Sequence, residues 1–550
     1  MSVSLGALLL AAAVPAVLYF LLITRKPQRN DDHGHGRRRL PPSPRSLPLL
    51  GHLHLLGPLP HRALRSLATA HGPVMLLRLG RVPTVIASSA AAAEEAMRAR
   101  DLDFASRPRS AVADRLLYGG RDVAFAPYGE RWRQARRVCT AHLLSARRVG
   151  SFRRVREQEA AALVARVVQE QEQQEQGVLG LGELLAAYAN AVVSRAAFGD
   201  ESARGLFGGE DVSKRRELVE AVAELHHLLG AEPMGELLPW LAWVDTVRGL
   251  EGRFRRTFEA LDGALEKVID DHCRRPPPHD GGDGGDHWDF VDVLLDVGKN
   301  DEYGIRLETA EIKAIILDMF AAGTNTTNTA MEWAMAELIT HPVAMRRLQD
   351  EIRDAVGSSP GGSGSVSEDH LSKLPYLEAV MRETLRLHVP APLLVPRETL
   401  RDTELLGYHV PARTRVLINA WAINRDPAAW GGGRRGVRAG EVPGQQRRLP
   451  GAGLRAAALR RREERVPRGR VRRAHHGAGA GDPALPFRLG AGRREGARHE
   501  RGERNHRAYQ VRSAACRQTV GSMMVVCATL HLRPIYYVCA CIAKGFVFRF

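Results

Sequence analysis

Apolar residues recur at helical spacing through most of the middle of the chain. The stretches from Arg153 to Gln174 and from Ala310 to Ala355 carry them three to four residues apart, which is typical of helices packed on a core. Shorter apolar runs at Val74–Leu79 and Thr84–Ala87 have the length and composition of strands. The pattern predicts a mainly α fold with a small β portion, from about residue 60 to residue 430.

Two segments interrupt this body, and the pattern stops after it. Pro276–Asp286 is rich in Pro, Gly and Asp, and Gly357–Ser365 is rich in Gly and Ser, so both are expected to be loops. After Trp430 the periodicity disappears, and Gly431–Arg512 has the composition of a disordered segment. Val520–Phe550 is apolar but fits no element. The last 120 or so residues are therefore predicted to be disordered or non-native.

The N-terminus begins with 21 uncharged residues, Val3 to Ile23, about the length of a transmembrane helix. A cleaved signal peptide is the alternative, but no positive residue precedes the run and Arg25-Lys26 follow it at once. The positive-inside rule then keeps the rest of the chain cytoplasmic. Pro41-Pro42-Ser43-Pro44 cannot be helical and is either a stiff hinge or an ordinary linker.

These patterns divide the chain into four parts. We expect a transmembrane anchor at 1–24, a basic and proline-rich hinge at 25–50, a folded body at 51–430 and an arginine-rich tail at 431–550.

The net charge of +17 is confined to that tail. Residues 431–550 hold 26 Lys and Arg against 7 Asp and Glu, a net +19, and the rest of the chain carries −2. Only Lys544 among those basic residues is a lysine, which selection for phosphate binding alone does not explain. A GC-rich message read in the wrong frame does explain it, because Arg, Gly, Ala and Pro codons are GC-rich.

The cysteines do not form a disulfide framework or a zinc site. Six are scattered over 550 residues, at Cys139, Cys273, Cys516, Cys527, Cys539 and Cys541. A reduced body that faces the cytosol is the simplest interpretation.

The segment Phe320 to Thr329 places Gly323 and four threonines inside a long predicted helix. A glycine there costs about 1 kcal/mol relative to alanine. The cost is useful where a ligand such as dioxygen must approach the backbone, with Thr326 donating a hydrogen bond and relaying protons. A polar turn of a buried helix is the alternative.

Two further pairs lie on single helix faces. Glu383 and Arg386 are three apart in a helix that Pro375-Tyr376 opens, and an exposed ion pair is the alternative there. Trp132 and Arg136 are four apart, after the turn Pro127-Tyr128-Gly129, and surface packing is the alternative. Arginine binds carboxylates through two hydrogen bonds. Downstream, His388, Pro390, Pro392 and Pro396 predict an extended segment that ends at Arg397.

Together these residues resemble the cytochrome P450 superfamily, specifically the plant A-type microsomal group, from Met1 to about Trp430. The matching stretches are Pro41–Pro44, Phe125–Gly129, Leu317–Thr324 and Pro375–Val380. The resemblance implies a heme cofactor, with Trp132, Arg136 and Arg397 at its propionates and Ala322, Gly323, Asn325 and Thr326 at the oxygen site. It implies that Glu383 and Arg386 hold the core through an arginine of a later Pro-Glu-Arg-Phe segment.

The resemblance also implies the activity and its partners. The family inserts one oxygen atom from dioxygen into a small hydrophobic metabolite, with electrons from NADPH through a cytochrome P450 reductase in the endoplasmic reticulum membrane. No nucleic-acid partner is implied. The alternatives are a membrane-anchored protein whose basic tail binds RNA, and a non-catalytic decoy that retains partner surfaces. A carbon monoxide difference spectrum separates an active enzyme from both.

Two departures from the family pattern matter. Asn325 stands where the family usually has Asp or Glu, and an amide cannot shuttle a proton as a carboxylate can. The family's Phe-x-x-Gly-x-Arg-x-Cys-x-Gly loop, which supplies the axial cysteine to the iron, does not occur in this sequence. The chain is therefore expected to lack metal ligation and activity.

A change of reading frame accounts for the missing loop. If the true frame starts at the second base of each codon, Leu454 to Arg468 can be re-read as Phe-Glu-Leu-Leu-Pro-Phe-Gly-Ala-Gly-Arg-Arg-Glu-Cys-Pro-Gly. Ala439 to Val442 can likewise be re-read as Pro-Glu-Arg-Phe. The hypothesis is that a lost or gained base, or a misplaced splice junction, lies near Trp430–Gly433.

Overall fold

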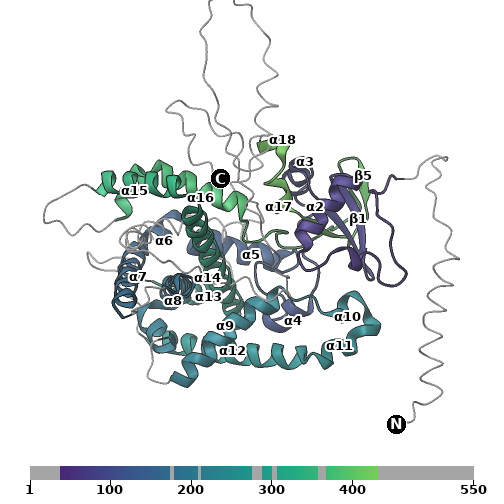
Figure 1. Cartoon of the computed structure of the whole chain (residues 1–550). Helices are drawn as coiled ribbons and strands as arrows, with labels where there is room; N and C mark the ends of the chain where they lie inside the picture. Colours follow the sequence, from purple (N-terminus) through teal and green to yellow (C-terminus); the bar gives the residue numbers. More distant parts are fainter. Residues whose placement is uncertain are drawn as a thin grey trace, which may run out of the picture.

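The protein is mainly helical, with a small sheet domain packed beside a larger helical body (Figure 1). The structure, a computed structural model, describes residues 38–173, 179–207, 212–275, 288–299, 306–356 and 367–430. The predicted anchor, the loops Pro276–Asp286 and Gly357–Ser365 and the predicted tail all lie outside these residues. Within the described part, no helix combines the length and the apolarity that a membrane crossing requires.

The main sheet combines two strands from early in the described chain with two strands from near its end. Six strands are described: β1 (Val74–Leu79), β2 (Val82–Ala87), β3 (Arg397–Glu398), β4 (Thr403–Leu405), β5 (Tyr408–Val410) and β6 (Arg415–Ile418). The four-stranded sheet has the order β1-β2-β6-β3, in which β2 and β6 are parallel and the other pairs antiparallel. Strands β4 and β5 form a separate hairpin.

The helices between residues 53 and 229 include those that follow the sheet strands and those that begin the helical body. They are η1 (Leu53–Leu55), α2 (Pro60–His71), α3 (Ala90–Glu94), η2 (Glu95–Ala99), α4 (Ala111–Leu116), α5 (Glu130–Val138), η3 (Cys139–Leu143), α6 (Ala146–Ser151), α7 (Arg153–Gln173), α8 (Leu181–Phe207) and α9 (Val212–Leu229).

The remaining helices complete the body. They are α10 (Met234–Leu237), η4 (Pro239–Leu241), α11 (Ala242–Val247), α12 (Leu250–Arg274), α13 (Phe290–Lys299), α14 (Thr309–Thr340), α15 (Pro342–Val356), η6 (Glu368–Lys373), α16 (Pro375–Leu387), α17 (Ala420–Ile423) and α18 (Pro427–Trp430).

The elements predicted from periodicity are present. Helix α7 matches the first predicted stretch, and β1 matches the first predicted strand. The second helical stretch is divided into α14 and α15 at Pro342, which has no N–H to continue α14 and which keeps the preceding residue out of the helical region. Pro41–Pro44 is not helical, as expected.

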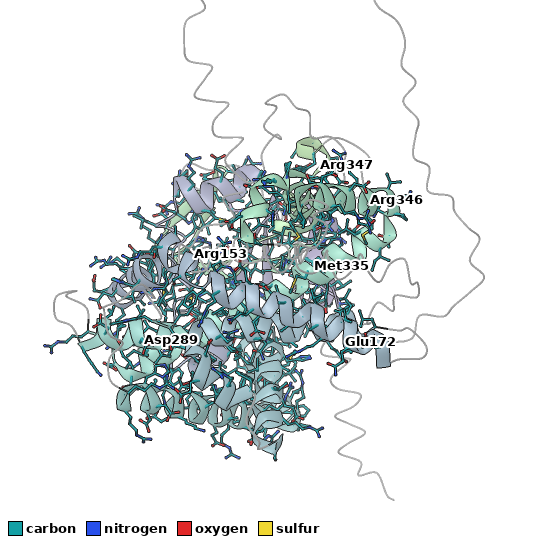
Figure 2. The ribbon with its side chains drawn as sticks, turned by 90° about the vertical axis from the view of Figure 1, so that its left-hand side faces the viewer. Arg153, Glu172, Asp289, Met335, Arg346 and Arg347 are labelled. Atoms are coloured by element: carbon teal, nitrogen blue, oxygen red, sulfur yellow. The ribbon has the colours of Figure 1, made fainter. Side chains whose placement is uncertain are left out.

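Helix α14 is the centre of the helical body, because it belongs to two hydrophobic clusters. Its first half, including Ile315 and Ile316, packs with residues of α4, α9, α12 and α13. Its second half, including Met331 and Met335, packs with α7, α8, α15 and α16. Met335 lies inside the body in Figure 2, while Arg346 and Arg347 of α15 stand at its rim. The predicted oxygen-site residues are thus carried by a helix that packs into both clusters.

Candidate functional site

The segment Phe320–Thr326 of α14 has an unusual set of hydrogen bonds on its carbonyl groups. The Thr324 hydroxyl donates to the Phe320 carbonyl over 2.8 Å, and the Thr326 hydroxyl donates to the Ala322 carbonyl over 2.5 Å. Between them, the Ala321 carbonyl lies 3.0 Å from Nε2 of His226 on α9. Bonds of this kind loosen the regular helix ladder, and the bond from His226 joins this turn to α9.

Three of the predicted oxygen-site residues therefore lie together, and the fourth is beside them. Gly323 is buried, Ala322 and Thr326 are half-buried, and Asn325 is exposed on the same stretch of helix. His226 was not predicted from the sequence. The sequence around His226 does not indicate its bond to the Ala321 carbonyl, because the two residues are 95 positions apart.

Trp132 and Arg136 share a face of α5, as the spacing predicts. The guanidinium carbon of Arg136 lies 5.0 Å from the centre of the Trp132 ring. The indole N–H of Trp132 donates to the Val123 carbonyl over 3.0 Å, which fixes the ring on the preceding loop. Burial lowers the pKa of Arg136, so this cation lies in a poorly hydrated place.

A second cationic centre combines the predicted Arg397 with Arg107, which sequence reasoning missed. Both side chains are buried, with exposed fractions of 7% each. Arg107 donates to the carbonyls of Val395 and Pro396, and Arg397 donates to the carbonyl of Phe104. Carbonyl groups satisfy N–H donors but do not neutralise a full charge.

The pKa values of Arg107 and Arg397 are both lowered. Burial lowers the pKa of Arg107 to about 9, and repulsion by Arg397 adds to the effect. Burial lowers the pKa of Arg397 to about 10. An anion bound near these two guanidinium groups reduces their mutual repulsion, and heme carries two carboxylates, which arginine can bind through two hydrogen bonds each. These residues fit the propionate end of the expected cofactor.

The described residues do not supply the other end of that cofactor. Cys139 is buried in the hydrophobic core near α5 and Cys273 is exposed at the end of α12. Neither stands in a Gly-x-Arg-x-Cys sequence, and no cysteine of the whole chain does. The axial thiolate that the family requires is therefore not provided by the sequence, and no step through the iron is derived for this chain.

Glu383 and Arg386 form a direct ion pair on α16. Arg386 donates from Nε and Nη2 to the two carboxylate oxygens of Glu383 over 2.7 Å and 2.6 Å. Its third donor, Nη1, reaches the Asn424 carbonyl over 2.7 Å, and its guanidinium lies 4.9 Å from the ring of Trp430. The pair joins α16 to the last helices of the described chain. The exposed pair weighed as an alternative is excluded, because both side chains are less than a fifth exposed.

A pair of buried carboxyl groups, Asp122 and Asp318, also went unpredicted. Asp318 of α14 accepts hydrogen bonds from the backbone N–H groups of Val123 and Ala124, over 2.6 Å and 3.0 Å. Burial, and then the charge of Asp122, raise the pKa of Asp318 well above its ordinary value, so the Asp318 carboxyl holds a proton that it can donate toward Asp122. The pair attaches the loop before α5, which carries Trp132's partner Val123, to α14.

Comparisons with known proteins agree with this arrangement. The cytochrome P450 family model matches residues 41–432. Cytochrome P450 71A6 of Nepeta racemosa is 46% identical over 421 residues, covering 76% of this chain and 81% of that protein. (+)-Menthofuran synthase of Mentha piperita is 43% identical over 394 residues, covering 72% of this chain and 75% of that protein.

Among solved structures, a zebra fish cytochrome P450 with progesterone superposes with a TM-score of 0.53 and 25% identity. The superposition covers 68% of this chain and 81% of the zebra fish chain. The mainly helical fold with its small sheet is therefore that of the same family. The chain belongs to the cytochrome P450 family of heme-dependent monooxygenases.

Proposed function

We propose that the body of this protein is built to insert one oxygen atom from dioxygen into a small hydrophobic plant metabolite. The supporting observation is a narrow apolar cavity between α8, α9, α12 and α14, which is lined by Phe320, two residues before the predicted oxygen-site residue Ala322. Its walls include Phe198, Phe207, Leu261, Leu317 and Phe320, and no charged side chain lines it. Such a lining favours an apolar substrate over a charged one.

The aromatic side chains of this cavity decide how much room a substrate finds. The ring of Phe320 stacks on Phe207 at 6.2 Å between centres and tilts toward Phe198 at 5.7 Å. With the rings in these positions the cavity has room for about one water molecule. Substrate entry therefore requires Phe207 or Phe320 to turn aside.

The cofactor supplies the redox chemistry when it is bound, and the residues of this chain hold and orient that cofactor and the substrate. Arg107, Arg136 and Arg397 would bind its carboxylates. The Thr326 hydroxyl now donates to the Ala322 carbonyl and has to turn from the helix to donate to a ligand. Asn325 can hold a water molecule but cannot take up and release a proton, so proton supply at this position is weakened.

The remaining parts of the proposal concern the ends of the chain. Residues 1–24 would anchor the protein in the endoplasmic reticulum membrane, residues 25–50 would be the hinge, and a membrane-bound reductase would supply electrons from NADPH. Residues 51–430 would then be an incomplete catalytic body.

We further propose that the chain as printed is inactive, because its sequence lacks the axial cysteine. The family model stops matching at residue 432, within the segment Trp430–Gly433 where a frame change is expected. The tail 431–550 would then be a frame-shifted product.

A carbon monoxide difference spectrum of the reduced protein tests this proposal. The printed chain and a version with the frame restored after Trp430 would be expressed in parallel and supplied with heme. We expect the thiolate-type band only in the restored version, and its loss when the restored cysteine is replaced by serine. A thiolate-type band from the printed chain, or none from a folded restored chain, contradicts the proposal. Sequencing of DNA and transcript across the codons for Trp430 to Arg468 decides which version exists in the plant.

A further inference from the structure

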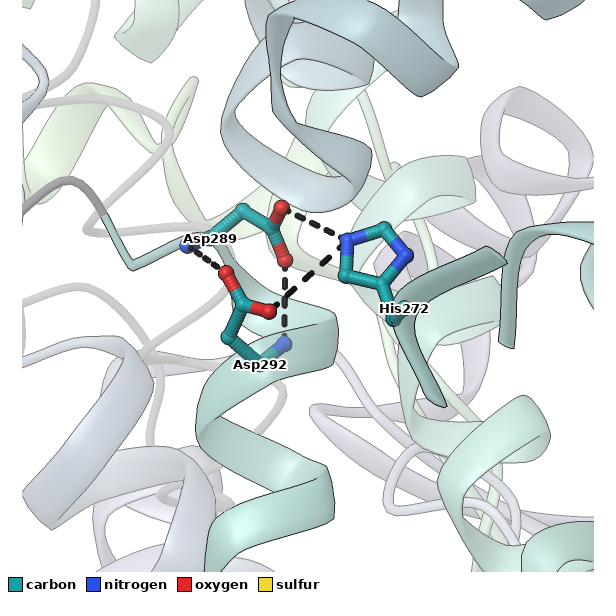
Figure 3. A group of neighbouring side chains, drawn as sticks. All are labelled: His272, Asp289 and Asp292. Carbon is teal, nitrogen blue, oxygen red and sulfur yellow. Dashed lines mark hydrogen bonds and ion pairs between the residues drawn. The ribbon is translucent and has the colours of Figure 1, made fainter. Parts of the chain in front are cut away.

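Three side chains converge at the junction of α12 and α13 (Figure 3). His272 belongs to the last turn of α12, Asp289 immediately precedes α13, and Asp292 lies in its first turn. Nε2 of His272 is 2.8 Å from Oδ2 of Asp289 and 3.9 Å from Oδ1 of Asp292. One potential ligand atom from each residue lies within 4.8 Å of the others.

The remaining polar atoms of these side chains are fixed by the main chain. Nδ1 of His272 bonds to the Val268 carbonyl over 2.7 Å. Oδ1 of Asp289 accepts the N–H of Asp292 over 3.0 Å, and Oδ2 of Asp292 accepts the N–H of Asp289 over 3.2 Å. The two bonds between Asp289 and Asp292 form a reciprocal capping box at the start of α13. A histidine whose second nitrogen donates to a carbonyl is the usual arrangement of a histidine that binds a metal. The inner atoms are thus oriented toward a common point.

The spacing of the inner atoms suits a small cation. Nitrogen and oxygen ligands lie about 2.0 to 2.1 Å from Zn²⁺ in a tetrahedral site, so they are about 3.3 Å from one another. The two distances from His272, 2.8 Å and 3.9 Å, lie on either side of that value. Movements of about half an ångström would bring both carboxylates to ligand distance.

Burial and charge also favour a cation. The His272 side chain is fully buried, and Asp289 and Asp292 are 5% and 20% exposed. Gly199, with φ of 74°, leaves no room for a Cβ, which would lie 2.5 Å from Oδ2 of Asp289. Two carboxylates and one protonated imidazole leave a net charge of −1. Two carboxylates, a neutral imidazole and a divalent ion are neutral.

Arg275 is the cation of the surroundings that attracts Asp292, but its own contacts lie elsewhere. It donates to Ser202 over 3.0 Å and pairs with Glu201 over 3.2 Å.

We propose that His272, Asp289 and Asp292 form a structural binding site for a divalent metal ion of the Zn²⁺ class. The mixture of one imidazole and two carboxylates suits this ion. The ion replaces the proton on Nε2 of His272, and water completes its coordination from the partly exposed side of Asp292. It joins α12 to α13, and it is independent of the oxygen chemistry at α14.

Metal titration of the full-length chain after treatment with a chelator tests the site. The chain has 21 histidines, so total Zn²⁺ uptake is not diagnostic, and the comparison is between variants. Asp292→Asn removes one charged ligand but keeps an oxygen for the Asp289 N–H. Asp296→Asn, on the same helix without a contact to His272, is the matched control.

We expect calorimetry to give one more tight Zn²⁺ equivalent for the natural chain and for Asp296→Asn than for Asp292→Asn. Affinity at this site should fall roughly tenfold or more in Asp292→Asn. Equal stoichiometry and equal thermal shifts in all three chains would mean that the cluster is an ion pair only. Titration of the natural chain with Co²⁺ does not depend on any variant. A four-coordinate absorption spectrum is expected, and a purely six-coordinate spectrum overturns the proposal.

Discussion

The charge of two pairs of aspartates in this protein is compensated in different ways. Asp289 and Asp292 face the imidazole of His272 at the junction of α12 and α13. Asp122 and Asp318 face each other between the loop before α5 and helix α14, where Arg107 attracts Asp122 without pairing with it. The residue type is the same, and both pairs accept hydrogen bonds from backbone N–H groups.

The difference between the pairs is the group that compensates their charge. In the first pair the imidazole of His272 lies 2.8 Å from Asp289 and 3.9 Å from Asp292, so a cationic group can compensate the charge of the carboxylates. In the second pair burial raises the pKa of Asp318 well above its ordinary value, and the charge of Asp122 adds to this. Burial raises the pKa of Asp122 to about 6. A proton takes the place of the cation, because two carboxylates in contact cannot both ionise.

The largest effect is expected where the compensating group is removed. His272→Ala leaves Asp289 and Asp292 buried without a base, which typically costs about 3 to 5 kcal/mol. Urea unfolding of the full-length chain in the presence of a chelator measures the change. The control is His227→Ala, an exposed histidine of α9, with an expected change within about 0.5 kcal/mol. A loss below about 1 kcal/mol for His272→Ala would show that the two pairs do not differ in this way.

The comparison also explains what the sequence could and could not predict. Local spacing predicts helix α7 and strand β1. It also predicts the pairs Trp132–Arg136 and Glu383–Arg386, because the two residues of each pair lie about one helical turn apart. Asp122 and Asp318 are 196 positions apart, and His226 and Ala321 are 95 apart. Nothing in either local sequence marks such contacts. Arg107 was missed for the same reason, since Val395 and Pro396 are its partners.

The second prediction concerns the pH dependence of the shared proton. An aspartate with a raised pKa binds its proton more tightly in the folded state than in the unfolded state. Its stabilising contribution is complete below the ordinary pKa near 4 and is lost as pH rises through the folded value. For Asp122 this window runs from about 4 to about 6. The free energy of unfolding should fall by up to about 1.4 kcal/mol per pH unit in this window.

Other carboxyls titrate in the same range, so the test compares variants. The difference in unfolding free energy between the natural chain and the double variant Asp122→Asn, Asp318→Asn isolates the pair. We expect this difference to shift against the natural chain between pH 4 and pH 6. A difference that is constant with pH would mean that the carboxyls do not share a proton.

The smallest effect is expected for Asp318→Asn at pH 4. The amide oxygen can still accept the N–H groups of Val123 and Ala124, and its NH₂ can donate to Asp122 as the shared proton does. The substitution therefore imitates the protonated acid, and the expected change is below about 1 kcal/mol. Asp318→Ala, which leaves two buried N–H groups without an acceptor, should cost about 2 kcal/mol or more. If Asp318→Asn were as damaging as Asp318→Ala, the pair would be ionised at pH 4. The contrast with Asp289 and Asp292 would then be one of hydrogen bonding alone.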